Sequence, residues 1–156
     1  LQAYDGRGLQ PGVAERADVE RVMGPPAMHW PEAAGGEKLA YPRGPAGFHT
    51  YMVWLDPAGR LVSSENVLKT KYFARIQSGM SQEDVLRLIG PPFAPWTSYF
   101  AARDELVWEW RWCDDWNEPA RFNVLFDGTT GKVRSTGSLT ESQRFPSVRG
   151  RSWCSQ

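Results

Sequence analysis

The fold of this chain is decided by one stretch, Gly79-Met80-Ser81-Gln82-Glu83-Asp84-Val85-Leu86-Arg87-Leu88-Ile89-Gly90-Pro91-Pro92. Ser81 can accept a hydrogen bond from the free N–H groups of a first helical turn, and Asp84 can return one, as in a capping box. Gly90 can close a helix, and the prolines after it cannot continue one. Three apolar residues at helical spacing predict a single apolar face: Val85, Leu88 and Ile89. The stretch therefore predicts one short helix between residues 81 and 90.

The same pattern occurs a second time, earlier in the chain. After Gly12, the segment Asp18-Val19-Glu20-Arg21-Val22-Met23-Gly24-Pro25-Pro26 has apolar residues at the same spacing and ends in an identical Gly-Pro-Pro. This copy has Ala14 where the later copy has the capping residue Ser81. We expect its helix over about residues 15–23. An internal repeat of this kind predicts two similar modules in tandem.

Strand patterns follow both predicted helices. Aromatic and β-branched residues mark strands at 38–41, 48–55 and 60–64, and Asp56-Pro57-Ala58-Gly59 reads as a hairpin turn. The later copy has strand patterns at 106–112, 121–126 and 132–135, with the turn Asp127-Gly128-Thr129-Thr130-Gly131. A further helix is predicted from about residue 66 to 76, because apolar residues recur there at helical spacing.

These elements predict an α+β fold made of two tandem modules, each a helix followed by three antiparallel strands. The strands are expected to form a curved antiparallel sheet with the helices on one face. We place the first module at residues 9–66, the second at residues 67–140, and a basic C-terminal tail at residues 141–156.

Composition and charge limit the class of protein. The 156 residues include 18 Lys and Arg and 18 Asp and Glu, so the formal net charge is zero and nucleic acid is not expected as a partner. No apolar run approaches the roughly 18 residues that span a bilayer. The chain begins with Leu1 rather than Met, so we expect that a targeting segment has been removed. Eight tryptophans point to sheet packing or to an adhesive surface.

The chain has two cysteines, Cys113 and Cys154. Their spacing matches no zinc motif, and in an oxidising compartment they could form one disulfide. Such a bond would hold the basic tail across one end of the second module. We treat this disulfide as a hypothesis that depends on a periplasmic location.

The helix pattern resembles the signature of the BamE-like (SmpA/OmlA) family of bacterial envelope lipoproteins, Gly-Met-Ser/Thr-x-x-x-Val-x-x-Leu-Leu-Gly-x-Pro. In this chain the signature stands as Gly79-Met80-Ser81, Val85, Leu88-Ile89-Gly90 and Pro92. The aromatic strand signature of the family, Trp-x-Tyr, corresponds to Trp108-Glu109-Trp110. The tandem arrangement is also similar to that of β-lactamase inhibitory protein. The resemblance covers roughly residues 9–139 and implies an envelope role, although the chain lacks the N-terminal cysteine that carries the lipid.

Alternation along the strands separates two faces of the predicted sheet. One face is apolar in both modules and is expected to lie under the helices. The opposite face mixes aromatic, methionine and arginine residues, a composition that protein interfaces favour. We expect a partner-binding surface there, with these candidate residues: Met52, Trp54, Val107, Arg111 and Leu125. The alternative is that another part of the chain, such as the tail, covers this face.

Enzymatic functions have little support in the sequence. The two histidines, His29 and His49, have no metal-binding spacing, and no nucleophile, phosphate or dinucleotide motif is present. The acids of the loop 113–119 lack the spacing and the glycine of an EF-hand, so a solvated turn is favoured over a calcium site. We expect no cofactor and no catalytic residues.

The sequence therefore predicts a non-enzymatic protein of the periplasm, anchored to the outer membrane and bound to a protein partner in envelope maintenance or outer-membrane protein assembly. Its only membrane association would be an N-terminal lipid. The alternative is an inhibitor that, like β-lactamase inhibitory protein, offers the open sheet face to an enzyme.

Overall fold

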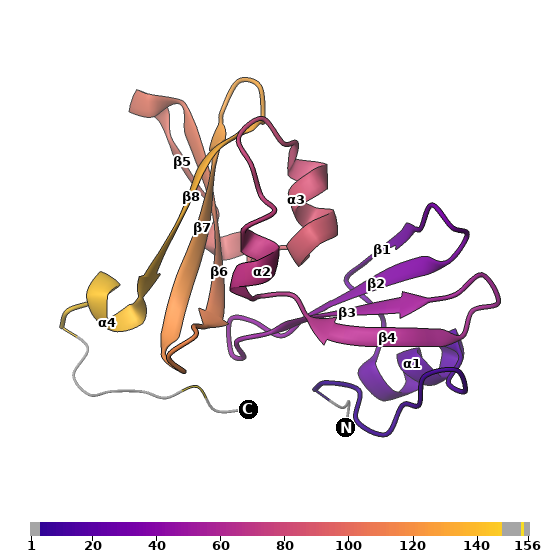
Figure 1. Cartoon of the computed structure of the whole chain (residues 1–156). Helices are drawn as coiled ribbons and strands as arrows, with labels where there is room; N and C mark the ends of the chain where they lie inside the picture. Colours follow the sequence, from indigo (N-terminus) through magenta and orange to yellow (C-terminus); the bar gives the residue numbers. More distant parts are fainter. Residues whose placement is uncertain (1–3, 148–153, 155–156) are drawn as a thin grey trace.

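Two antiparallel sheets make up the protein, as the computed structural model of Figure 1 shows. The structure describes residues 4–147 and Cys154. Each sheet has four strands, in the orders β1-β2-β3-β4 and β5-β6-β7-β8. The prediction of an α+β fold with two tandem modules is confirmed. The strands do not form one curved sheet, however, and each module has one strand more than the three that were predicted.

The elements alternate along the chain as the repeat predicts. The first module contains α1 (Arg16–Met23), β1 (Met28–Pro31), β2 (Glu37–Pro42), β3 (Thr50–Leu55) and β4 (Leu61–Asn66). The second contains α2 (Thr70–Phe73), α3 (Gln82–Ile89), β5 (Ser98–Phe100), β6 (Glu105–Cys113), β7 (Pro119–Asp127) and β8 (Val133–Thr140). Two short 3₁₀ helices flank β5, namely η1 (Ala94–Trp96) and η2 (Ala101–Arg103), and α4 (Glu141–Arg144) follows β8.

The two repeated helices begin differently. The Ser81 hydroxyl accepts a hydrogen bond from the Asp84 N–H, and the Asp84 carboxylate accepts one from the Ser81 N–H, both at 3.1 Å. This is the predicted capping box of α3. In α1 the N-cap is Glu15, whose N–H donates to Asp18 at 2.9 Å. Ala14, which the repeat aligned with Ser81, is instead a buried core residue one position before the cap.

The strands β1 and β5 were missed because both are short edge strands that follow proline-rich segments. They pair with β2 and β6. The helix predicted over 66–76 is reduced to the four residues of α2. Asn66 explains this, because its side chain accepts hydrogen bonds from the N–H groups of Thr50 and Leu68 and holds the end of β4 in place.

The helices divide the molecule into layers. In Figure 1, α1 lies on the outer side of the first sheet, whereas α2 and α3 lie between the two sheets. The side chains agree, because one core cluster joins α1 to the first sheet through Val19, Met23, Leu39 and Val53. A second and larger cluster joins both sheets to α2 and α3. The first sheet is therefore covered on both faces, which corrects the expectation of helices on one face only.

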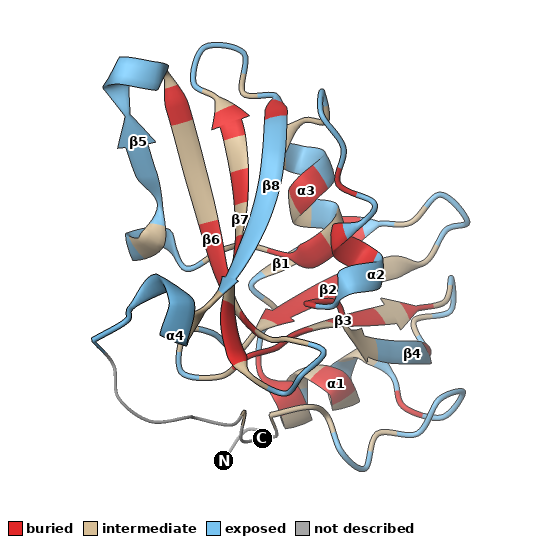
Figure 2. Cartoon of the chain, turned by 60° about the vertical axis from the view of Figure 1, so that its left-hand side comes forward, coloured by how far each residue is buried: buried red, intermediate tan, exposed pale blue. Residues whose placement is uncertain are grey.

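The second cluster is built from direct contacts across the layers. Phe73 of α2 stacks on Phe122 of β7, with ring centroids 3.7 Å apart. The indole of Trp30 in β1 donates to Glu83 of α3 at 3.0 Å. Figure 2 shows the buried residues concentrated where the sheets face these helices. The helix α3, whose pattern indicated the two modules, therefore also packs against both of their sheets.

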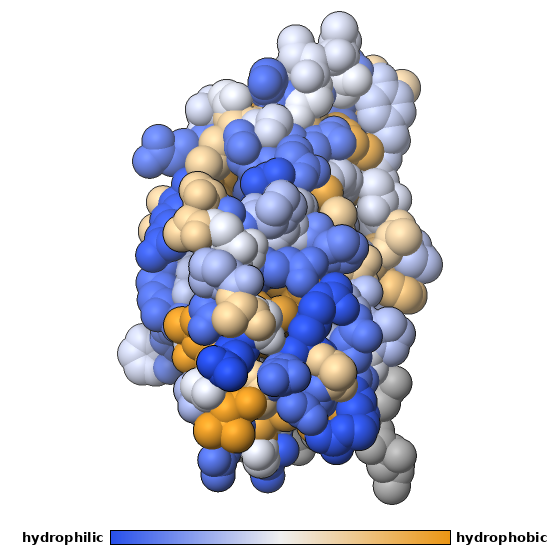
Figure 3. Space-filling model, turned by 90° about the vertical axis from the view of Figure 1, so that its right-hand side faces the viewer, coloured by the Kyte–Doolittle hydropathy of each residue, from blue (hydrophilic) through white to orange (hydrophobic). Residues whose placement is uncertain are grey.

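The surface carries few large apolar areas on the side shown in Figure 3, where hydrophobic atoms form small groups among hydrophilic ones. Of the helices that the structure describes, none has the length and apolar character needed to cross a bilayer. Cys113 and Cys154 form the predicted disulfide, with their Cα atoms 5.9 Å apart. Of the predicted tail, the structure describes residues 141–147 and Cys154, and the basic residues Arg149 and Arg151 lie outside the described part.

Candidate interaction site

The predicted binding surface is covered in the first module. Met52 has no exposed surface, because the end of α3 packs over this face of the first sheet. Met52 was therefore wrongly predicted as a partner-binding residue. Trp54 is partly buried against the same cluster and lines the floor of an open groove of about 590 Å³ beside Val62. The sequence could not show this covering, because the helix responsible belongs to the other module.

In the second module, α2 and α3 lie on the other side of the sheet (Figure 1), and the corresponding face is contacted at Arg121 by α4 and by the Trp96 ring of η1. The register of β6 and β7 places Val107 opposite Leu125, Glu109 opposite Asn123, and Arg111 opposite Arg121. These residues alternate with those that face α2 and α3, so all of them lie on the outer face. We call this surface, defined by those three residue pairs, the open face. It brings together three predicted residues: Val107, Arg111 and Leu125.

A network of ion pairs occupies the part of the open face nearest α4. The carboxylate of Glu109, which is almost fully buried, accepts hydrogen bonds from Arg121 at 2.9 Å and from Asn123 at 2.8 Å, and it also contacts Arg144. Glu141 of α4 accepts two bonds from Arg111, at 2.8 and 2.9 Å, and one from Arg121 at 2.8 Å. Since buried charges are costly unless paired, the network accounts for the burial of Glu109.

The ion pairs of Glu141 with Arg111 and Arg121 connect α4 to the second sheet. Burial alone would raise the pKa of Glu141, but the hydrogen bonds from Arg111 and Arg121 outweigh it and hold the pKa below its ordinary value. The carboxylate is therefore ionised at neutral pH. Arg111, a predicted partner-binding residue, is therefore partly buried and held in place by Glu141.

Aromatic rings support the same arginines from segments far apart in the sequence. The guanidinium of Arg121 lies 3.8 Å from the ring centroid of Trp96, and that of Arg111 lies 4.3 Å from the ring centroid of Phe48. No sequence pattern indicated these partners, which come from η1 and from the segment before β3. The signal for α4 was present, because Thr140 and Gln143 form a capping box.

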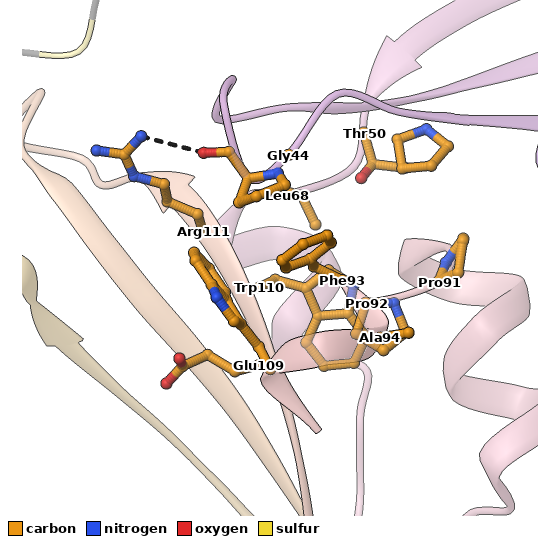
Figure 4. Close-up of a pocket in the computed structure, with 13 residues that line it drawn as sticks. Gly44, Thr50, Leu68, Pro91, Pro92, Phe93, Ala94, Glu109, Trp110 and Arg111 are labelled. Atoms are coloured by element: carbon orange, nitrogen blue, oxygen red, sulfur yellow. Dashed lines mark hydrogen bonds between the residues drawn. The ribbon is translucent and has the colours of Figure 1, made fainter. Parts of the chain in front are cut away.

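A cavity of about 160 Å³ borders the open face, between the two modules. Its walls are mostly rings, as Figure 4 shows for Pro92, Phe93 and Trp110. Arg111 lies along one side and donates to the carbonyl oxygen of Pro45 at 3.1 Å. The carboxylate of Glu109 points away from the cavity, toward the open face. No sequence motif marked this cavity, because its walls come from both modules.

Trp110 carries a buried polar atom without a partner. Its Nε1 has no hydrogen-bond acceptor within the described part of the chain. Leaving a buried donor unpaired costs on the order of 1–3 kcal/mol, and most buried polar groups avoid that cost. Trp110 is therefore a residue of the cavity whose indole N–H has no hydrogen-bond acceptor in the described part of the chain.

The remaining predicted polar groups have local partners. The Nδ1 atom of His49 lies 2.6 Å from the hydroxyl of Tyr4, and burial lowers the pKa of His49. His29 is exposed and pairs with Glu37. In the loop after β6, Asp114 accepts hydrogen bonds from the N–H groups of Trp116 and Glu118, which shapes the turn. Within residues 4–147 and Cys154, no three potential metal ligands lie together.

No protein-family model matches this sequence, and no curated protein matches it. Solved structures that are similar to it include two with the following descriptions. One is described as an osmotically inducible lipoprotein, OsmE, with 27% identity and a TM-score of 0.37, and the match covers 51% of this chain and 86% of that one. The other is an extracellular protein with an SCP domain from Bacillus anthracis, with 13% identity and a TM-score of 0.32, covering 86% of this chain and 45% of that one. This chain is thus similar to a lipoprotein over about half of its length.

Proposed function

We propose that this chain is a non-enzymatic, protein-binding component of the bacterial cell envelope. It resides in the periplasm, is anchored to the outer membrane as a lipoprotein, and acts in envelope maintenance or in the assembly of outer-membrane proteins. The helix signature that begins with Gly79-Met80-Ser81 supports the envelope assignment, and the disulfide suits an oxidising compartment. The partner meets the open face of the second sheet.

The observation that carries this proposal is the composition of the open face. Val107 and Leu125 are only partly buried, whereas the strand neighbours of Leu125 on the opposite face, Val124 and Phe126, are fully buried core residues. The strand register places the exposed side chains of Phe100 and Leu139 on the same face, beside Glu105 and Arg121. Apolar and aromatic groups next to arginine are the combination that interface cores enrich.

The ion-pair network supports binding in a second way. Arg111 and Arg121 are already held by Glu141, so a partner would not have to immobilise these long side chains. Ordering a flexible side chain costs about 0.5–1.5 kcal/mol at an interface. A pre-ordered surface therefore loses less on association than a surface of mobile arginines.

Site-specific photo-crosslinking in the bacterial periplasm tests the proposal. A photoreactive amino acid replaces Leu125 in one protein and Val107 in another, with Val13 and Val62 as exposed control positions in the first module. We expect a discrete crosslinked partner from positions 125 and 107 and none from 13 or 62. The band from position 125 should disappear when Val107→Asp is added. Equal crosslinking from all four positions, or none from 125 and 107, would rule out the open face.

The inhibitor alternative makes a different prediction about the same surface. Purified β-lactamases would be assayed with the chain and with its Leu125→Asp variant. Inhibition that the variant abolishes would replace the envelope role with enzyme inhibition. Unchanged β-lactamase activity in the presence of the chain leaves the envelope proposal as the one in agreement with the data.

A further inference from the structure

A separate pocket of about 420 Å³ lies in the first module, where the start of β3 and the end of β4 meet the N-terminal segment. Every residue that lines it carries a polar group: Asp5, His49, Tyr51, Ser64, Glu65, Asn66 and Lys69. None of these residues belongs to the open face. A ligand of this pocket would therefore bind independently of the partner proposed above.

The two acids of the pocket are already paired within the protein. The Asp5 carboxylate accepts hydrogen bonds from the backbone N–H of Arg7 at 3.1 Å and from the Arg7 guanidinium at 2.9 Å. Glu65 accepts a hydrogen bond from the Tyr72 hydroxyl at 2.5 Å and forms an ion pair with Lys71. The residues that line the pocket thus keep no unpaired negative charge.

The hydrogen bonds of His49 determine which of its ring nitrogens carries the proton. The Tyr4 hydroxyl accepts a bond from the Phe48 N–H at 3.2 Å, so it can donate its own hydrogen to His49 Nδ1, 2.6 Å away. Nδ1 is then an acceptor, and Nε2 carries the proton of the neutral ring. Burial and the charge of Lys69 lower the pKa of His49, so the neutral ring predominates at pH 7. Nε2 has no partner among the described residues, yet it remains accessible to solvent.

Two further donors of the pocket are free. The side-chain oxygen of Asn66 accepts hydrogen bonds from the N–H groups of Thr50 at 3.1 Å and Leu68 at 3.2 Å. Its amide nitrogen, which can only donate, is left without a partner in the described part of the chain. The Tyr51 hydroxyl also has no partner there, and burial raises the pKa of Tyr51 to about 12, so the hydroxyl keeps its proton. Neither group is sealed from solvent.

Lys69 adds a positive charge that no described residue neutralises through an ion pair. Its side chain is exposed at the rim of the pocket. The ammonium lies close enough to His49 to contribute, after burial, to the lowered pKa of that ring. The pocket therefore combines one uncompensated cation with three neutral donors, while its acceptors are already used. This combination is suited to an anion.

A carboxylate fits this set of groups better than a phosphate. A carboxylate carries one charge and accepts several hydrogen bonds through its two oxygens, and its bonds to charged donors are the stronger ones. A phosphate monoester carries nearly two negative charges at neutral pH. It would lie beside the carboxylates of Asp5 and Glu65 with Lys69 as the one unpaired cation of the pocket lining.

We propose that this pocket binds a ligand through a single carboxylate group. Lys69 supplies the counter-charge, and His49 Nε2, the Tyr51 hydroxyl and the Asn66 amide supply hydrogen bonds to the two carboxylate oxygens. Small organic acids and the acidic side chains of polypeptides share this group. The inference goes beyond the proposed function, because none of its residues contributes to the open face.

Titration of the full chain followed by nuclear magnetic resonance at pH 7 and constant ionic strength tests the site. The probes are acetate, its neutral analogue acetamide, and inorganic phosphate. We expect acetate to shift the ring signals of His49 in a saturable manner, acetamide to leave them unmoved, and phosphate to bind more weakly than acetate. His29, which is exposed and pairs with Glu37, is the internal control and should not respond.

Acetate should also change the titration of His49. Because a bound anion stabilises the protonated ring, saturating acetate should raise the pKa of His49. Unmoved His49 signals, equal shifts from acetate and acetamide, equal shifts of both histidines, or tighter binding of phosphate would each overturn the proposal.

Matched variants separate the site from general effects of charge and folding. Lys69→Gln should weaken acetate binding about tenfold, whereas Lys132→Gln removes an exposed lysine of the second module and should leave binding unchanged. Tyr51→Phe should weaken binding about threefold. Tyr41→Phe removes the unpaired hydroxyl of the residue opposite Tyr51 in β2, which does not line the pocket, and should have no effect. Equal losses within either pair would contradict the site.

A last comparison distinguishes the two sources of the carboxylate. Butyrate represents small organic acids, and glutamate with an acetylated amino group and a methylamide at its carboxyl end represents an acidic side chain. Tighter binding of the capped glutamate would assign the site to a polypeptide, and tighter binding of butyrate to a small acid. Binding of neither compound would overturn the proposal.

Discussion

Glu109 is the most deeply buried charge on the open face, and it balances Arg121 and Arg144. Removing one partner of a buried ion pair leaves the other without compensation, at a cost of about 3–5 kcal/mol. We expect Glu109→Gln to lower the free energy of unfolding by about 3 kcal/mol in urea denaturation. Glu20→Gln, which removes a half-exposed pair with Arg16, should cost less than about 1 kcal/mol. Similar losses in both variants would contradict the network.

Glu141 makes the stability of the open face depend on pH. Because its pKa is lower in the folded protein than in the unfolded chain, where it is about 4.3, its ion pairs stabilise the protein above that value. This stabilisation is lost as the pH falls through the lower, folded pKa. Glu141→Gln should therefore reduce the melting temperature at pH 7, and the difference from the native protein should shrink as the pH falls below the unfolded value and through the lower, folded pKa. A difference that stays constant with pH would assign the loss to another cause.

Helix capping tests the repeat at the level of an element. Ser81→Ala removes the hydroxyl that caps α3 and should cost about 1 kcal/mol in the free energy of unfolding. Ala14→Ser, which the sequence repeat would suggest as a gain, should not stabilise α1, because Ala14 is buried and Glu15 is the N-cap. Denaturation of both variants provides the check. A gain from Ala14→Ser would mean that the cap of α1 can move by one residue.

Local signals predicted the elements whose formation depends on their own residues. The helix α3, the two hairpins and the inward-facing side of β6 and β7 follow from capping residues, turn residues and alternation, all readable over short stretches. The edge strands β1 and β5 could not be predicted in this way, because they form only by pairing with β2 and β6. Asn66 similarly ended a helical pattern through contacts with Thr50, a residue of the preceding strand.

The candidate site was predictable only where it stays within one module. Val107 and Leu125 lie on the face that alternation assigned to them. Met52 does not remain accessible, and the reason is the packing of α3 against the first sheet. The cavity and the support of Arg111 by Phe48 arise between modules, where no local pattern records the contact.

Gly90 lies at the contact between the two modules. It has a φ of +75°, and a Cβ built on it would come within 2.8 Å of Thr50 Cγ2. Gly79 has a φ of +93° but no atom within 4 Å of such a Cβ. Gly79→Ala should therefore cost about 1–2 kcal/mol from backbone strain alone, and Gly90→Ala should cost more. Adding Thr50→Ser, which deletes the clashing methyl group, should restore part of the loss only in the Gly90 variant. If the losses from Gly90→Ala and Thr50→Ser simply add, the Thr50 methyl group does not clash with a Cβ at position 90. The two modules would then lie farther apart than in this structure.

The disulfide between Cys113 and Cys154 closes a long covalent loop from the end of β6 to the C-terminal tail. Cys113 and Cys154 are separated by 41 residues, and closing loops of this size stabilises proteins by about 2–4 kcal/mol. The double variant Cys113→Ser/Cys154→Ser should unfold at lower urea concentration by a corresponding amount. A thiol assay of the untreated native protein should detect no reactive thiol, and detection of two would contradict the bond.

Because α3 lies between the two sheets (Figure 1), it covers one face of each, and it determines which sheet face is left without it. Aligning the hairpins at Asp56 and Asp127 matches Ala40, Met52 and Thr50 of the first sheet with Glu109, Asn123 and Arg121 of the second. The first set is buried under α3, while the second set is polar, with Glu109 buried in the ion-pair network and Arg121 paired with Glu141 of α4. In an array of stacked repeats, the terminal unit carries a polar outer face. The charged open face thus acts as the end cap of a repeat array two units long, and a partner bound there would take the place of a third module.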